Sequence, residues 1–358
     1  MKKITSMILA LVFAVSVIGS ASAKTLKIQL TFPKTSYDGQ IVKMWTDRVT
    51  KLTRGELKFE LLSKGEVVGM KETLEAVDKG LVDGGAAWTH YWSNYHPAAM
   101  LFGSPVAGGG IGLSTKSWLA WYFDNGGKEL YDQLWSEMGM NVKGFVMASS
   151  GPEALGWFKE PIKNMDDFRK YRFRTPPGIP GQTYKDIGIA SVSLSGGDIL
   201  PALEKGTIDA AEWCCPKPDS VFGFQKVLKN YYLQGLHQNV VNGDIYINGD
   251  VYNSLTDHQK YAMEVASEAM ITRNITNRAV ENGKALIDLT QNHGVKLWDT
   301  PADYFTEYMN AAQATLKKNA ASNAFFKEVY EHMTAHAKIV VPFIAQMETS
   351  DASIGTAF

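Results

Sequence analysis

Two stretches of the chain follow one pattern, and this repeat limits the fold more than any other feature of the sequence. Residues 76–88 read AVDKGLVDGGAAW and residues 202–216 read ALEKGTIDAAEWCCP, with an Ala, a Lys-Gly pair and an Asp at one constant offset. The Gly stands where a left-handed residue ends a helix, and the apolar residues after it suit a strand inside a sheet. Two β-helix-β units of one design predict an α/β protein with two similar lobes. The alternative is an ordinary helix stop that recurs by chance.

Side chains suited to a ligand site follow both repeated strands. Glu212 and Trp213 come directly after the second strand, and Trp88 and Tyr91 come at the end of the first. Ligands of open α/β sheets bind beyond the carboxyl ends of the strands. We therefore expect Trp213, Trp88 and Tyr91 to form apolar walls of a cleft, whereas core packing is the alternative for each ring.

The segment YRFRT, residues 171–175, alternates like a strand and ends at Pro176. This places Arg174 at the carboxyl end of a strand, facing a loop. A guanidinium in that position holds a carboxylate through two parallel hydrogen bonds. We expect Arg174 to bind an organic anion; Arg172 is its rival for the role, and a surface arginine is the plain alternative.

The N-terminus has the pattern of a secretory signal peptide. Lys2 and Lys3 precede an apolar run at 7–18 and the small residues SASA at 20–23. The run is shorter than the ~20 residues that a membrane span needs, and no later stretch is long enough. We expect a periplasmic protein that starts near Lys24 and does not insert into the membrane.

Composition narrows the class of function further. Without the signal peptide the chain carries 34 Lys and Arg residues against 37 acidic ones. This near balance leaves no electrostatic footprint for nucleic acid or an anionic membrane. A chain of 358 residues that is 45% hydrophobic can bury large cores and should form about two domains.

The only cysteines are the neighbours Cys214 and Cys215. An ordinary disulfide within the chain is therefore excluded. A vicinal disulfide, which an oxidising compartment permits, and a pair of packed thiols both remain open. A zinc site lacks a second pair of ligands at the right spacing.

Two strands are expected to cross between the lobes, one near 140–148 and one that returns near 236–248. They give the following expected organisation: signal peptide 1–23, lobe I 24–147 plus about 249–300, lobe II 148–248, and C-terminal helices 301–358 that pack across the lobes. Several crossings describe a hinged clamshell. We expect Asn248, at the end of the returning strand, to contact the ligand.

Six segments of the chain, taken together and in order, resemble the solute receptors of TRAP transporters, the DctP-type periplasmic binding proteins. The resemblance is to the branch that binds 2-oxo and 2-hydroxy monocarboxylates. The segments are KGEVVGMKETLEAVDKGLVDGG, WTHYWSNYHPAAMLFGSPVAGG, GPEALGWF, YRFRTPP, VSLSGGDILPALEKGTIDAAEW and FGFQKVLKNYY.

The resemblance implies a type II-like clamshell of two α/β lobes with a long helix that spans them. It implies a receptor without catalysis or a required cofactor, which delivers an organic acid to a sodium-coupled TRAP membrane permease. Arg174 corresponds to the family's carboxylate-pairing arginine, and Glu153 lies beside it in the ligand site. The amphipathic C-terminal helices are compatible with a homodimer.

The same resemblance implies a cation that bridges ligand and protein. Its ligands correspond here to Glu153, Glu212, the carbonyl of Trp213 and Gln238. Glu153 stands where the branch commonly has Gln, and Gln238 where it commonly has Glu. Two carboxylates near one arginine repel an anion unless Na⁺ or Ca²⁺ neutralises them, and oxygen ligands suit such cations. Direct pairing of both carboxylates with Arg174, without an ion, is the alternative.

Two other functions are weighed against transport. A secreted hydrolase would use Glu153 and Glu212 as acid and base, but the chain has no nucleophile elbow, HExxH motif or cofactor fingerprint. A receptor that presents its ligand to a sensor kinase or chemoreceptor would use the same fold.

Overall fold

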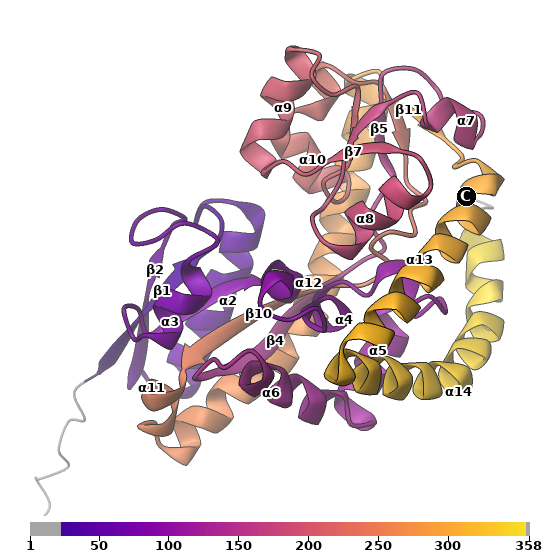
Figure 1. The fold of residues 1–358 in the computed structure, drawn as a ribbon. Helices are drawn as coiled ribbons and strands as arrows, with labels where there is room; N and C mark the ends of the chain where they lie inside the picture. Colours follow the sequence, from indigo (N-terminus) through magenta and orange to yellow (C-terminus); the bar gives the residue numbers. More distant parts are fainter. Residues whose placement is uncertain (1–22, 356–358) are drawn as a thin grey trace, which may run out of the picture.

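The computed structural model describes residues 23–355, which form two sheet-centred lobes (Figure 1). Nearly all of the predicted signal peptide, residues 1–22, lies outside the described residues. Within the described part, no helix combines the length and the apolar character that a membrane crossing requires.

The sheet of lobe I has five strands in the order β2-β1-β3-β10-β4. Parallel pairing joins β1 to β2 and β3, whereas β10 runs antiparallel to both β3 and β4. The strands are β1 Lys24–Leu30, β2 Leu57–Leu62, β3 Gly84–Trp88, β4 Val142–Ser150 and β10 Val241–Asn248.

The sheet of lobe II has six short strands in the order β11-β9-β5-β8-β6-β7. Here β6 pairs in parallel with β7 and β8, and β5 runs antiparallel to β8 and β9. The strands are β5 Gly156–Phe158, β6 Arg172–Arg174, β7 Ala190–Val192, β8 Ala210–Ala211, β9 Asn230–Tyr232 and β11 Lys296–Trp298.

The two sheets repeat one design, as the sequence predicted. In each, a parallel trio is followed by an antiparallel strand from a crossing segment: β2-β1-β3 then β10, and β7-β6-β8 then β5. The repeated Asp has the same contact in both lobes. Asp83 accepts a hydrogen bond from the N–H of Lys27 at 2.7 Å, and Asp209 accepts one from the N–H of Arg172 at 3.4 Å.

The glycines of the repeat also behave alike. Gly80 and Gly206 have φ of 69° and 66°, in the left-handed region that glycine enters at little cost. Each ends its helix, α3 Thr73–Asp78 or α9 Gly196–Glu204, so that the chain turns directly into the next strand. The matching sheet order, Asp contacts and turns show that the repeat is structural and no chance recurrence.

The expected lobe boundaries need correction at three places. The strand at 241–248 was expected in lobe II, but β10 pairs along its length with β3 and β4 of lobe I. Because β4 also continues to Ser150, lobe II begins after that residue rather than at 148. Residues 296–298 were expected in lobe I, but β11 pairs with β9 of lobe II. Backbone pairing, which the chain order does not reveal, decides these memberships.

The helix α12 Asp257–Asn292 spans both lobes, as the resemblance implied (Figure 1). At 36 residues it is ~54 Å long. Thr256 and Gln259 form its capping box. Met263 and Met270 are buried in the core of lobe I, whereas Leu289 is buried in the core of lobe II.

The C-terminal helices α13 Ala302–Ser322 and α14 Ala324–Gly355 cover the side of the molecule. α13 packs against α8 of lobe II, where Tyr308 lies over Tyr184 with ring centres 4.8 Å apart. α14 packs against α5 of lobe I, where His332 accepts from the indole N–H of Trp121 at 2.9 Å. The C-terminal segment therefore packs against both lobes, against lobe II through α13 and against lobe I through α14.

The remaining helices are short and flank the two sheets. In lobe I they are α2 Tyr37–Leu52, η1 Thr89–Asn94, α4 Ala99–Gly103, η2 Val106–Gly108, α5 Thr115–Asp124, α6 Gly127–Glu137 and α11 Gly249–Asn253. In lobe II they are α7 Met165–Phe168, α8 Ile179–Asp186, α10 Pro216–Phe222 and η3 Phe224–Lys226.

The shared role of the repeated Asp predicts a measurable effect on stability. Asp83→Ala leaves the N–H of Lys27 without its charged acceptor, so the free energy of unfolding should fall by about 1 kcal/mol. Chemical denaturation measures this change. The control Asp47→Ala removes a carboxylate that is 63% exposed and paired only within its own helix, and should cost less than about 0.5 kcal/mol. Equal losses in both variants would contradict the role of Asp83.

Candidate functional site

A pocket lies between the two lobes, with an empty volume of about 490 Å³ that includes space open to solvent. Lobe I, lobe II, the crossing segments and α12 all contribute to its wall. The lining residues are Asp38, Trp88, His90, Tyr91, Glu153, Arg174, Pro176, Pro177, Trp213, Cys214, Pro218, Gln238, Val241 and Arg278. Five of the residues expected to bind ligand are among them, and the pocket adjoins the carboxyl ends of β3, β6 and β8.

Arg174 ends β6 and is 4% exposed. Its Nη1 donates to Glu212 Oε1 at 2.5 Å and to the Glu212 carbonyl at 2.7 Å, and its Nε and Nη2 donate to the Leu194 carbonyl. A guanidinium has five N–H groups, so one on Nη2 is left over from these contacts. The expected grip of two parallel hydrogen bonds on a ligand is therefore not available in this arrangement.

Arg172, the rival for the same role, is excluded by its position. It begins β6, its side chain is 53% exposed, and Asp209 pairs with it through two hydrogen bonds of 2.8 Å. Arg172 and Asp209 therefore join the starts of β6 and β8, outside the pocket lining. The two arginines of one strand have separate tasks.

Trp213 lies against the cationic side chain in the pocket. The centre of the Trp213 ring lies 5.1 Å from the Arg174 guanidinium and 4.9 Å from the centre of the Phe222 ring. An aromatic face attracts a cation and shields it from water. Trp213 thus packs against the Arg174 side chain and also lines the pocket.

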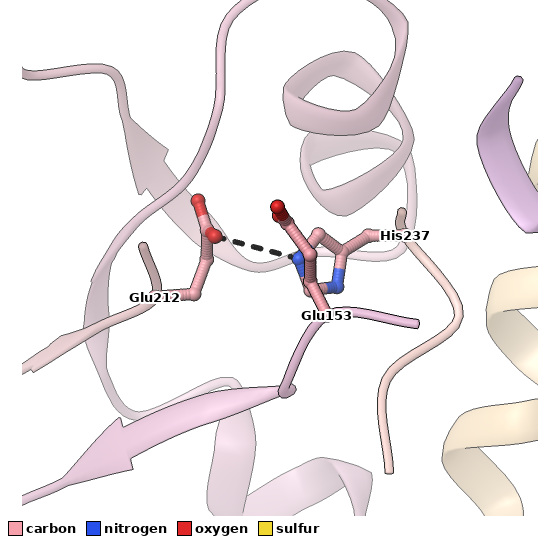
Figure 2. A group of neighbouring side chains, drawn as sticks. All are labelled: Glu153, Glu212 and His237. Atoms are coloured by element: carbon pink, nitrogen blue, oxygen red, sulfur yellow. Dashed lines mark ion pairs between the residues drawn. The ribbon is translucent and has the colours of Figure 1, made fainter. Parts of the chain in front are cut away.

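Behind the pocket, Glu153, Glu212 and His237 form a buried group (Figure 2). One ligand atom from each lies within 4.8 Å of the others. Glu212 follows β8, Glu153 lies between β4 and β5, and His237 lies between β9 and β10. His237 Nε2 is 3.5 Å from Glu212 Oε2. Both carboxylates were expected from the sequence, whereas the histidine was not.

The two carboxylates differ in their partners. Glu212 pairs directly with Arg174, whereas no hydrogen bond holds Glu153 Oε2. Burial, and secondly the negative charge of Glu212, raises the pKa of Glu153 well above its usual range. Direct pairing with Arg174 therefore accounts for Glu212 alone.

The donor set fits a bound cation. Buried oxygen atoms of Glu153 and Glu212 lack hydrogen-bond donors, and a buried polar group without a partner is costly. Gln238 lines the pocket and donates its side-chain N–H to Ser104 Oγ at 3.1 Å. The backbone carbonyl of Gln238 accepts from the Glu153 N–H at 3.0 Å. The role of the Trp213 carbonyl as a cation ligand stays a prediction.

A second arginine, Arg278 of α12, lines the pocket and was not found from the sequence. Its Nη2 donates to Asp38 at 2.7 Å, and its Nη1 lies 3.5 Å from Cys214 Sγ. Cys214 and Cys215 form a vicinal disulfide, the alternative that the sequence left open. Since sulfur is a weak acceptor, Nη1 keeps donor capacity toward the pocket. Burial raises the pKa of Asp38.

The expected aromatic walls Trp88 and Tyr91 line the pocket from lobe I. Trp88 ends β3 and faces the Arg278 guanidinium at 5.8 Å, and Tyr91 packs edge-on against His90 at 5.0 Å. Burial lowers the pKa of His90 to about 4, so this imidazole is uncharged at neutral pH.

The prediction that Asn248 contacts the ligand is wrong. Its amide N–H groups donate to the carbonyls of Val77 and Asp78, and its oxygen accepts from the N–H groups of Asp250 and Val251. These contacts fasten the start of α11, at the far end of β10 from the pocket. Asn248 caps a helix because β10 runs away from the cleft, a direction fixed by its pairing with β3 and β4.

The missed residues had weak signals in the sequence. Arg278 and Asp38 sit in helices whose pattern is amphipathic, so a charged residue in either looks like a solvated face. His237 directly precedes Gln238, a predicted ligand, but alternation along an extended segment would place the two on opposite sides. Only the folded crossing segment brings His237 to the carboxylates.

Asp219 supports the turn that carries the disulfide. Its Oδ1 accepts from the N–H groups of Cys214 at 3.0 Å and Cys215 at 3.2 Å, and its Oδ2 accepts from the side chains of Trp157 and Tyr231. Burial raises the pKa of Asp219 to about 7, although hydrogen bonds from Trp157, Tyr231 and the Cys214 N–H act in the opposite direction. One buried carboxyl group thus connects the turn that carries the disulfide to the core of lobe II.

The geometry defines a class of protein: two lobes of one design, joined by crossing segments and a shared helix, with a pocket of paired charges between them. Known proteins identify the family. The model of the bacterial extracellular solute-binding proteins, family 7, matches residues 30–323. The chain belongs to this DctP family, whose members are solute-binding receptors of TRAP transporters and not enzymes.

A curated relative and several solved structures agree with this membership. The monocarboxylate 2-oxoacid-binding periplasmic protein of a Nostoc species is 32% identical over 298 residues, which cover 81% of this chain and 78% of the relative. A TRAP solute-binding protein from Bordetella bronchiseptica, a dimer with copurified calcium and picolinate, superposes with a TM-score of 0.85 at 24% identity. It covers 94% of this chain and 99% of its own.

A second structure shares the fold to the same degree. The TRAP solute-binding protein from Colwellia psychrerythraea, solved with calcium and pyruvate, has a TM-score of 0.85 at 22% identity over 94% of this chain and all of its own. These structures confirm the two-lobed α/β fold. The hydrolase alternative is not supported, since the fully buried Glu212 is engaged by Arg174.

The buried Asp219 predicts how stability depends on pH. Its folded pKa of about 7 exceeds the ordinary value of 3.8, so the folded state holds a proton that the unfolded chain releases near pH 4. This contribution to stability is complete below pH ~4 and is lost as the pH rises toward 7, on the order of 4 kcal/mol at most. Asp219→Asn should therefore flatten the fall of the unfolding free energy between pH 4 and 7.

Denaturant titrations at several pH values measure that slope. Asp47→Asn, which removes an exposed acid, serves as the control and should keep the wild-type slope. An unchanged slope in Asp219→Asn would show that this carboxyl is ionised across the whole range.

Proposed function

We propose that this protein is a periplasmic receptor for an organic monocarboxylate, a 2-oxo or 2-hydroxy acid held together with a bridging cation, and that it delivers the acid to a TRAP-type sodium-coupled permease. The observation that carries the proposal is Arg174, a buried guanidinium between the lobes with a free N–H and a carboxylate pair beside it. The name of the Nostoc relative, a monocarboxylate 2-oxoacid-binding protein, supports the class of ligand.

The balance of charge in the pocket favours a monoanion accompanied by a cation. Two guanidiniums, Arg174 and Arg278, stand against three carboxyls: Asp38, Glu153 and Glu212. When all are ionised, the site has one excess negative charge and repels an acid anion. A divalent cation together with a monocarboxylate brings this set of charges to neutrality, whereas a dicarboxylate leaves it negative.

The walls suit a small acid. The rings of Trp213, Trp88 and Tyr91 line the pocket and give it apolar surface beside the two arginines. The oxygen on C2 of a 2-oxo or 2-hydroxy acid sits next to the carboxylate, so both can bind one cation. This chemistry explains why a carboxylate pair and an arginine belong in one site.

Delivery to a permease rests on the family, whose members work with a membrane transporter. The alternative partner, a sensor kinase or chemoreceptor, would read the same closed form. Uptake of labelled acid in cells that lack this receptor separates the two uses, because only transport requires it for accumulation of the acid.

A homodimer is also proposed, on the basis of an apolar stripe on α14. Ile339, Phe343 and Met347 are 74%, 64% and 60% exposed and recur every four residues, so they share one face of the helix. Three large exposed apolar side chains in a row are typical of an interface.

One prediction of this proposal concerns Arg174. Thermal shift against a panel of organic acids, with and without Ca²⁺, should show stabilisation by at least one monocarboxylate. Arg174→Ala should abolish this shift, and Arg174→Lys should keep part of it, because Lys retains the charge but loses the planar set of donors.

The matched control lies two residues away on the same strand. Arg172→Ala removes an arginine that is paired outside the pocket and should leave the ligand shift intact. Because Arg174→Ala also strands Glu212, the melting temperature of each ligand-free variant is recorded. Binding that survives in folded Arg174→Ala, or the absence of any monocarboxylate ligand for the wild type, would refute the proposal.

Another prediction concerns the apolar stripe on α14. Phe343→Glu places a charge in the apolar face, so light scattering at micromolar concentration should show a wild-type dimer and a monomeric variant. Ala345→Glu adds the same charge at an exposed residue on the opposite side of the helix from Phe343 and should remain dimeric. A monomeric wild type would dismiss the dimer without touching the ligand site.

A further inference from the structure

The buried group of Glu153, Glu212 and His237 contains more unpartnered polar atoms than a packed interior tolerates. Glu153 Oε2, Glu212 Oε2 and both ring nitrogens of His237 have no hydrogen-bond partner among the described residues. His237 and Glu212 are fully buried and Glu153 is 5% exposed. Buried polar atoms of native proteins are nearly always bonded, to protein, water or an ion. This concentration of unbonded atoms indicates a missing partner at their centre.

The three side chains converge from segments that are tied to one another. The Glu153 N–H donates to the Gln238 carbonyl at 3.0 Å, and the Ala154 N–H donates to the Cys214 carbonyl at 2.8 Å. The Glu212 N–H donates to the Arg174 carbonyl at 3.2 Å. These backbone bonds connect the segments that carry the three side chains, and Figure 2 shows the side chains lying next to one another.

The histidine changes the kind of cation that such a group prefers. Carboxylates alone suit Ca²⁺ and Mg²⁺, whereas imidazole nitrogen favours Zn²⁺ and other first-row transition metals. Zinc takes three protein ligands of these types and leaves a position open for another molecule. Among the three residues only Glu153 also lines the pocket, so Glu153 connects this group to the proposed acid site.

We infer that His237, with Glu153 and Glu212, forms a mixed nitrogen and oxygen site that binds a divalent transition metal such as Zn²⁺ in preference to Ca²⁺. A metal ion there gives partners to Glu153 Oε2, Glu212 Oε2 and His237 Nε2 at once. The inference rests on the proposed function only for the acid that completes the coordination of the metal.

A simple ion pair between a protonated His237 and Glu212 explains less. The distance of 3.5 Å between His237 Nε2 and Glu212 Oε2 does not form a hydrogen bond in this geometry. Such a pair also leaves Glu153 Oε2 without a partner. Glu212 already has a cationic partner in Arg174.

The experiment measures metal binding without any organic acid. The mature protein is stripped of metal with a chelator, and the affinities for Zn²⁺ and Ca²⁺ are measured by competition with a chromophoric chelator. The wild type should bind one Zn²⁺ at least tenfold more tightly than Ca²⁺. His237→Gln should weaken Zn²⁺ at least tenfold and change the Ca²⁺ affinity less than threefold.

The control is His336→Gln, which alters an equally buried histidine between α14 and α5. Both nitrogens of His336 are hydrogen-bonded, to Asn125 and to the Ser117 carbonyl, so Zn²⁺ affinity should not change. X-ray absorption of the wild type loaded with Zn²⁺ should show one imidazole ligand, a readout that does not depend on how the variants fold.

Two outcomes overturn the inference: a wild type that prefers Ca²⁺, or Zn²⁺ affinity and absorption spectra that show no histidine. Neither outcome affects the acid-induced thermal shift that depends on Arg174. Conversely, selective Zn²⁺ binding in a protein that takes no monocarboxylate would keep the metal site and reject the proposed transport ligand.

Discussion

The buried pair between Arg174 and Glu212 is the interaction on which the rest of the site depends. Both side chains are almost fully buried, so each charge requires the other to offset its loss of hydration. Glu212 and the Leu194 carbonyl together occupy four of the five N–H groups of the guanidinium. One N–H of Nη2 remains for a ligand, which is too few for a grip of two parallel hydrogen bonds in this arrangement.

The surrounding structure keeps this pair at the boundary between the lobes. Arg174 is fixed by the Leu194 carbonyl and by the ring of Trp213, and the Glu212 backbone returns a hydrogen bond to the same strand. Asp219 accepts hydrogen bonds from the backbone N–H groups of the adjoining turn at Cys214 and Cys215. The buried charge pair thus belongs to the edge of the lobe II sheet, and lobe I supplies Trp88 and Tyr91 to the facing wall.

The sequence predicted the features that depend on local pattern, and missed those that depend on pairing partners. The repeat, the helix stops at Gly80 and Gly206 and the position of Arg174 at a strand end follow from residues close in the chain. Strand membership does not: β10 was placed in the wrong lobe, and Asn248 was carried with it to a role it does not have. His237 and Arg278 reach the site through a crossing segment and a distant helix, which no local pattern describes.

The continuity of α12 has a consequence for how the receptor handles different ligands. Each end of this helix is embedded in a different core, and Arg278 projects from its interior beside Asp38 of one lobe and Cys214 of the other. Arg278 therefore reaches the pocket from an element that both lobes share. Substitutions in the wall of either lobe can alter the pocket without displacing the backbone that carries this guanidinium.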